Sequence, residues 1–114
     1  MIETYFTQLE QILQAFPTIQ SSMLKTKRYN AKQGSVSGSI TFETGCRLEF
    51  VEVKDMDHPT KIKYRYQYMD QDDICLFRYD NAPHHRNVST FPHHKHAGEE
   101  IEASHEPTLF KCLT

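Results

Sequence analysis

The 114-residue sequence lacks the features that define several common classes of small protein. Its three cysteines are odd in number and share no C-x-x-C spacing, which argues against a disulfide framework and against a zinc knuckle. It has no P-loop, no G-x-G-x-x-G segment and no H-E-x-x-H segment, so neither a nucleotide-handling fold nor a zinc-protease site is indicated. A net charge of −2 and a pI near 6.4 exclude the overall basic character that many nucleic-acid-binding proteins have.

Long apolar runs are also missing. No run approaches the roughly 18 residues of a membrane-spanning helix, and the first residues, MIET, lack the basic start and apolar run of a signal peptide. Unpaired thiols are typical of a reducing compartment. We therefore expect a cytoplasmic protein that makes no membrane contact, with residues 1–114 forming a single domain.

The first clear pattern lies in residues 2–16. Apolar side chains recur there at three- and four-residue steps, which predicts an amphipathic helix. Pro17 follows directly and disfavours helical backbone at the residue before it. Because the polar face is not rich in Lys and Arg, the pattern favours a helix that covers a sheet over one that lies on a membrane.

Apolar and polar residues alternate through much of the remaining chain, which predicts β-strands. The predicted strands are residues 20–30, 36–42, 47–53, 62–68 and 74–79. Short connections favour an antiparallel meander of four to five strands. With the N-terminal helix packed on it, this sheet gives an α+β fold. A short helical turn is also expected after Pro107.

The strand at 62–68 places three tyrosines on one face. Such a row can stack on nucleic-acid bases, but aromatic alternation is more often ordinary sheet packing. Arg65 belongs to the opposite face together with Lys61 and Lys63. That face is basic and can meet either a phosphate backbone or water.

Histidine is concentrated in one stretch of the chain. Five of the seven histidines fall there, namely His84, His85, His93, His94 and His96. Prolines interrupt the strand pattern after Asp80, so residues 81–98 are predicted to form an ordered, histidine-rich loop over the sheet, anchored by Phe91. Imidazole is the side chain best suited to proton transfer and metal binding near neutral pH.

One hypothesis for this stretch is cleavage of RNA at a 2′-hydroxyl. The reaction needs a base, an acid and a cation near the phosphate; two imidazoles can perform both proton transfers, and arginine binds phosphate in a bidentate manner. The predicted catalytic residues are His84, His85, His93, His94, His96 and Asp80, and the predicted substrate-binding residues are Arg65, Arg78, Arg86 and Lys95. No cofactor is predicted.

Two other interpretations remain open. His94 and His96 point to the same side of an extended chain, and with His84 or His85 they would make a three-histidine zinc site. Adjacent histidines would project oppositely, however, so only one of each pair could join such a site. The imidazoles can also simply hold the loop in shape. Asp80 would either orient a histidine or form an Asx turn.

Two segments carry a family resemblance. FRYDNAPHH at residues 77–85, followed by TFPHHKH at 90–96, resembles the signature of the TumE family of small bacterial toxins, and KYRYQY at 63–68 matches it too. The resemblance implies a growth-inhibiting toxin of a type II toxin–antitoxin module. A helix-turn-helix antitoxin would neutralise it by direct binding, and RNA cleavage is the activity we expect.

The function hypotheses are therefore distinct. The first is a metal-independent ribonuclease toxin whose substrate is RNA and whose protein partner is the antitoxin. The second is a non-catalytic module that partners a DNA-binding protein and keeps the histidine loop for structure. A zinc hydrolase is the third. A homodimer is compatible with each of them.

Overall fold

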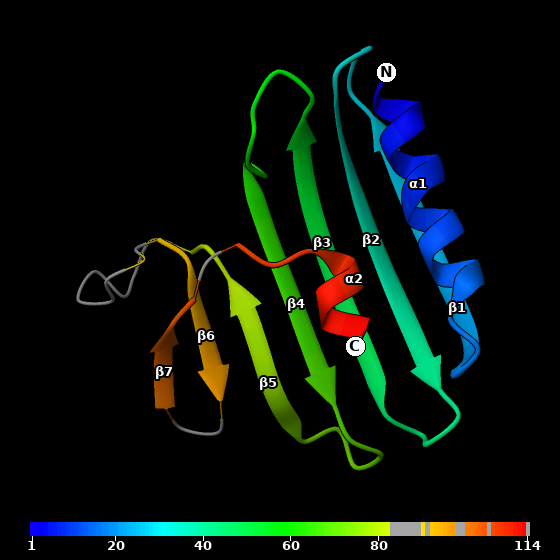
Figure 1. The fold of residues 1–114 in the computed structure, drawn as a ribbon, viewed down its shortest axis with the longest axis vertical. Coiled ribbons are helices and arrows are strands. Elements are labelled where there is room, and N and C mark those ends of the chain that lie inside the picture. The colour runs from blue at the N-terminus through cyan, green and yellow to red at the C-terminus, as the bar shows by residue number, and fades with distance from the viewer. Residues whose placement is uncertain (83–89, 91, 98–99, 105, 114) are drawn as a thin grey trace.

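The chain forms one antiparallel sheet with two helices on the same side of it (Figure 1). The computed structural model describes residues 1–82, 90, 92–97, 100–104 and 106–113. The elements in chain order are α1 (Ile2–Ala15), β1 (Ile19–Arg28), β2 (Gln33–Phe42), β3 (Arg47–Asp55), β4 (Lys63–Met69), β5 (Cys75–Asp80), β6 (His94–Ala97), β7 (Glu100–Ala103) and α2 (Leu109–Leu113). No described helix meets the length and hydropathy needed to cross a membrane.

Helix α1 confirms the predicted N-terminal helix. Its apolar stripe is buried against the sheet, at Ile2, Phe6, Leu9 and Leu13. Phe16 follows with extended backbone angles, φ −93° and ψ 110°, as expected for a residue that precedes a proline. The helix therefore ends where the sequence predicts, and α1 covers β1 and β2.

The predicted strands and their antiparallel meander are also confirmed, but the sheet is larger than predicted. It has seven strands in the order β1 to β7, not four to five. Strand β6 lies inside the stretch predicted as a loop, and it pairs with β5 from Phe77↔Ala97 to Asp80↔His94. His-Lys-His-Ala has no apolar alternation, so backbone pairing forms this strand without a sequence pattern that reveals it.

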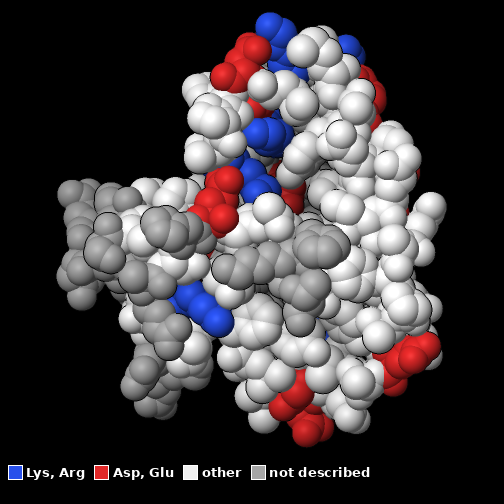
Figure 2. All heavy atoms as spheres, in the orientation of Figure 1, with Lys and Arg blue, Asp and Glu red and all other residues white. Residues whose placement is uncertain are grey.

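The two faces of the sheet have different surroundings. The face under α1 and α2, which we call the covered face, carries the core side chains Val36, Ile40, Leu48, Phe50, Tyr64 and Tyr66. The opposite side, the open face, carries Ser37, Ser39, Val51, Arg65 and Arg78, and neither described helix packs on it. Figure 2 views the molecule from the covered face, where the described charges lie in small groups of both signs.

Tyr64 and Tyr66 are 1% and 0% exposed, which confirms that the tyrosine row packs in the core. Glu52 is buried beside them and accepts hydrogen bonds from the hydroxyls of Tyr66 and Tyr5. Burial, and then the negative charge of Glu52, raises the pKa of both hydroxyls far above the ordinary value. This network ties α1 to the middle of the sheet.

Candidate functional site

Four of the predicted site residues meet where β5 and β6 pair. The register places Asp80 opposite His94 and Arg78 opposite His96. Because side chains alternate along a strand and pair across neighbouring strands, all four lie on the open face. We call these four residues the Asp80 cluster.

The carboxylate of Asp80 is the centre of this cluster and is only 5% exposed. Its Oδ1 lies 2.7 Å from Nε2 of His94 and accepts the backbone N–H of Ala82 at 3.1 Å. Its Oδ2 accepts Nε–H of Arg78 at 3.0 Å and lies 3.5 Å from Nε2 of His96. Asp80 thus forms an Asx turn and contacts two imidazoles at the same time.

The His94 ring is buried, with 1% of its surface exposed. Its Nδ1 lies 2.9 Å from the carbonyl oxygen of Pro92, which can only accept, so Nδ1 carries a hydrogen. Nε2 faces the Asp80 carboxylate, although the approach is off the line of a good hydrogen bond. Both ring nitrogens thus face oxygen atoms that accept, and the ring holds the Asp80 carboxylate inside the fold.

His96 is the imidazole of the cluster that solvent reaches, with 19% of its side chain exposed. Its Nε2 lies 2.9 Å from Nη2 of Arg78, which can only donate. In this contact Nε2 is therefore the acceptor. The ring packs edge-on against His94, with centroids 4.8 Å apart.

The cluster opens onto a hollow of about 550 Å³ at the ends of β4 and β5. Three cationic side chains line this basic hollow, namely Lys63, Arg65 and Arg78. Asn81 and Asp80 also line this hollow. Asn81 is held in place because its Oδ1 accepts the Tyr64 N–H at 3.0 Å. The lining combines cations with a carboxylate, and the imidazole of His96 contacts two of the lining residues, Arg78 and Asp80. A phosphodiester requires such an arrangement of cations and acid–base groups.

His93 and Lys95 lie on the covered face and do not join this cluster. Nδ1 of His93 lies 2.8 Å from the hydroxyl of Tyr64, and the two rings stack with centroids 5.7 Å apart. The ammonium of Lys95 lies 5.3 Å and 5.1 Å from the ring centroids of Phe77 and Tyr79. The prediction that His93 and its neighbour project oppositely is confirmed, while catalytic or binding roles for His93 and Lys95 stay predictions.

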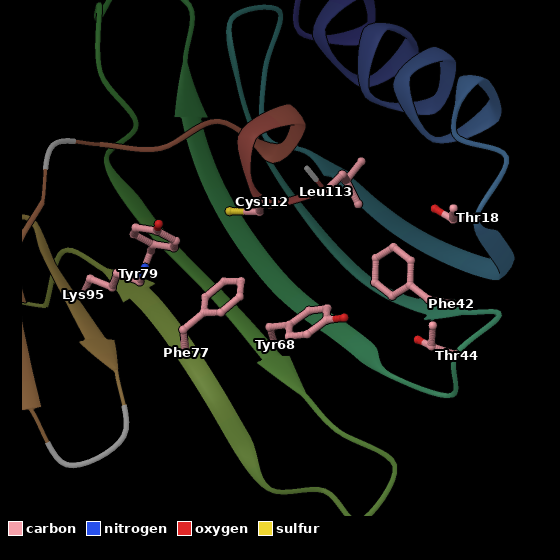
Figure 3. A pocket seen from close by; sticks show the side chains of 9 residues that line it. All are labelled: Thr18, Phe42, Thr44, Tyr68, Phe77, Tyr79, Lys95, Cys112 and Leu113. Atoms are coloured by element: carbon pink, nitrogen blue, oxygen red, sulfur yellow. The ribbon is translucent and has the colours of Figure 1, made fainter.

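Lys95 borders a different hollow, of about 560 Å³, on the covered face (Figure 3). Aromatic rings of Phe42, Tyr68, Phe77 and Tyr79 line it, together with the end of α2. Burial raises the pKa of Tyr68 to about 12, so its hydroxyl stays protonated at neutral pH. This hollow holds aromatic surface and one cation, without an acid–base pair among its described lining residues.

Three predicted residues and the predicted anchor lie outside the described residues: His84, His85, Arg86 and Phe91. Two further residues line the basic hollow, Lys63 and Asn81. The sequence places Lys63 on the basic strand face of Arg65, but neither Lys63 nor Asn81 was predicted to bind substrate. The position of Asn81 depends on its contact with β4, which results from strand pairing, so no local sequence pattern predicts it.

A metal ion is the alternative occupant of the Asp80 cluster. Donor atoms of Asp80, His94 and His96 lie within 4.8 Å of one another, and two imidazoles with a carboxylate can bind a transition metal. The guanidinium of Arg78, however, contacts both Asp80 and His96. A divalent cation would have to displace the guanidinium from Asp80 and His96, which are two of the three residues that would bind the metal. The donor set therefore fits a metal poorly.

The comparisons with known proteins agree with the signature in the sequence. The family model described as Toxin TumE matches residues 9–114. Searches of the curated proteins and of the solved structures returned no match. The matched region includes every residue of the Asp80 cluster and nearly the whole chain. The chain therefore belongs to the TumE toxin family, and membership of a toxin family implies an antitoxin partner.

Proposed function

We propose that this TumE toxin cleaves RNA in the cytoplasm by histidine acid–base chemistry, without a metal ion. It would be the toxin of a type II module, neutralised by a helix-turn-helix antitoxin. The observation that carries the proposal is that Arg78 and Asp80 line the basic hollow while His96 contacts both of them. A base, a phosphate-binding cation and an orienting carboxylate are thereby within contact of one another.

In the proposed reaction a base removes the proton of a 2′-hydroxyl, and the 2′-oxygen attacks the neighbouring phosphorus. The bond from phosphorus to the 5′-oxygen breaks, and that oxygen takes up a proton as it leaves. His96 is the base, because its Nε2 accepts from Arg78 and its ring is the partly exposed imidazole of the cluster. The acid is expected at His84 or His85, which remain predictions from the sequence.

The contact between Arg78 and His96 gives this step a defined order. Nη2 of Arg78 occupies the lone pair of His96 Nε2 in the resting protein. A phosphate in the hollow competes for the guanidinium, and the exchange frees the imidazole to accept a proton. Arg65 lines the same hollow and binds the same phosphate group. His94 is a positioning residue, because its ring is buried against Asp80.

The test compares the parent with His96→Ala, using a labelled RNA under single-turnover conditions. We expect the cleavage rate to fall by about 10²–10⁴-fold, the contribution of one acid–base group, with little change in melting temperature. His58→Ala is the matched control, since His58 lies in the turn after β3 with 62% of its side chain exposed. A chelator should leave the parental rate unchanged.

Three outcomes would contradict this proposal. Parental cleavage by His96→Ala would remove His96 as the base. Loss of activity with a chelator and its return with Zn²⁺ would establish the metal site instead. Folded parent that arrests growth and cuts no RNA would favour a non-catalytic binding module, in which the contacts of His93 with Tyr64 and of His94 with Pro92 serve structure alone.

A further inference from the structure

One row of side chains crosses the open face in unbroken register. From β1 to β6 the paired residues are Lys25, Ser37, Val51, Arg65, Asp80 and His94. Neighbouring strands are about 4.8 Å apart, so Lys25 and Arg65, three spacings apart, are separated by about 14 Å at the backbone. The row therefore leads from the first strand directly into the Asp80 cluster.

The surface along this row is hollowed on both sides of Arg65. A second hollow, of about 290 Å³, lies over β1 to β4 and is lined by Met23, Lys25, Ser37, Ser39 and Arg65 among others. Arg65 also lines the basic hollow. Because the two hollows share this residue, they adjoin, and an extended ligand in one can continue into the other.

The cations of this row are available to a ligand. Within the described residues, Lys25 and Arg65 take part in no ion pair and no side-chain hydrogen bond. Arg28 has the opposite strand phase and pairs with Glu3 of α1. Lys27 shares the phase of Lys25, and its ammonium lies 5.6 Å from the ring centroid of Tyr29. The segment of basic residues at 25–28 is thus divided by the fold, and Lys25 and Lys27 lie on the open face.

The acid on this part of the face does not cancel that charge. Glu49 lines the second hollow, but its carboxylate lies 3.3 Å from the guanidinium of Arg47. Besides these charged residues the lining has Ser37 and Ser39, the residues Gly38, Phe50 and Val51, and the side chain of Met23, which is 64% exposed. Cations, hydroxyl donors and an exposed apolar side chain together suit phosphates, riboses and unstacked bases.

We propose that the open face binds single-stranded RNA along this row, with Arg65 contacting the phosphate at the Asp80 cluster and Lys25 contacting a phosphate further along the strand. This inference rests on the proposed function and adds a binding track several nucleotides long. It also explains how a chain with net charge −2 can bind RNA, because local fields act where the total does not.

The test measures binding without cleavage. The probe is a fluorescent single-stranded dodecamer of 2′-O-methyl RNA, which has no free 2′-hydroxyl, and its anisotropy is followed at several salt concentrations. We expect Lys25→Ala to weaken binding by up to about fivefold at low salt, as for one exposed ion pair. The slope of log K against log salt should fall by about 0.7, the value for one phosphate contact with a single strand.

Lys32→Ala is the matched control, because it removes the same charge from an exposed lysine. Lys32 lies in the turn after β1 and pairs with Asp57. It should keep the parental slope, whereas Arg65→Ala should lower it. Circular dichroism checks that each variant is folded, and Lys25→Glu should weaken binding further than Lys25→Ala.

If both Lys25→Ala and Lys25→Glu bind the dodecamer with the affinity and salt dependence of the parent, the proposed binding track is wrong, even if the protein cuts RNA. Loss of antitoxin affinity with unchanged RNA affinity would also overturn it and assign the face to the protein partner. Binding of the dodecamer that depends on Lys25, by a parent that cuts no RNA, would support the track and contradict the proposed ribonuclease activity.

Discussion

Two buried carboxylates lie on opposite faces of the same sheet, and their different neighbours give one a structural role and the other a proposed chemical role. Glu52, on the covered face, accepts from the hydroxyls of Tyr5 and Tyr66. Asp80, on the open face, contacts the guanidinium of Arg78 and the imidazole of His94. Both carboxylates are surrounded by donors, but the donors differ in kind.

The donors decide what each carboxylate can do. Tyrosine hydroxyls whose pKa is raised by burial keep their protons at any physiological pH, so the Glu52 network is fixed. Imidazole, in contrast, ordinarily exchanges protons near neutral pH, and the Asp80 cluster borders the basic hollow. A buried carboxylate therefore indicates a reactive site only when its partners can change charge and a ligand can approach them.

The largest effect is expected from removing the structural carboxylate. Glu52→Ala leaves two buried hydroxyls without their acceptor and opens a cavity, and should lower the free energy of unfolding by about 3–5 kcal/mol. Glu49→Ala is the matched control on the same strand, exposed on the open face, and should change it by less than about 0.5 kcal/mol. Urea denaturation measures both. Similar losses in the two variants would show that Glu52 is not a structural centre.

The second prediction tests the other carboxylate. Asp80→Asn should lower RNA cleavage by about 10–10²-fold, as loss of an orienting carboxylate does, because Arg78 loses its counter-charge and the imidazoles lose the carboxylate that they contact. Asp55→Asn is the control, since Asp55 also ends a strand and accepts a backbone N–H two residues on, at 2.9 Å. Single-turnover rates that fall equally in both variants would indicate a general effect on folding.

The smallest effect concerns alkaline stability. The pKa of Tyr66 is higher in the folded state than the ordinary value of about 10. The native state therefore retains a proton that the unfolded chain releases, and stability falls as pH rises above about 10. Tyr66→Phe removes this proton, so its free energy of unfolding should fall less steeply than that of the parent, by up to about 1.4 kcal/mol per pH unit. Denaturation at pH 8, 10 and 11 measures the slopes, and parallel slopes would contradict the prediction.

Sequence patterns foretold the parts of the fold that local periodicity encodes. The stripe from Ile2 to Leu13 predicts α1, and the tyrosine alternation predicts β4. Strand β6 escapes prediction because His94 to Ala97 form it by pairing with β5 and by burying an imidazole, not by an apolar pattern. Local periodicity records only which side chains meet the core.

The candidate site was predictable in its residue types and only partly in its geometry. Asp80, Arg78, His94 and His96 stood out from composition and spacing, and alternation separated His93 from His94. The contact between Arg78 and His96 could not be foreseen, because it depends on the register between β5 and β6. Likewise, Glu52 shares the phase of Leu48 and Phe50, but its partner Tyr5 comes from a distant helix.

The unbroken meander order has a consequence for synthesis of the toxin. Each strand pairs with the one that precedes it, so the sheet can grow as the chain leaves the ribosome, with short loops to close up to β5 and a longer connection, residues 81–93, before β6. The residues of the Asp80 cluster lie between positions 78 and 96 and meet only when β6 pairs with β5. A growing chain therefore carries α1 and strands β1 to β5 before it carries the complete Asp80 cluster, so the proposed site forms late in synthesis.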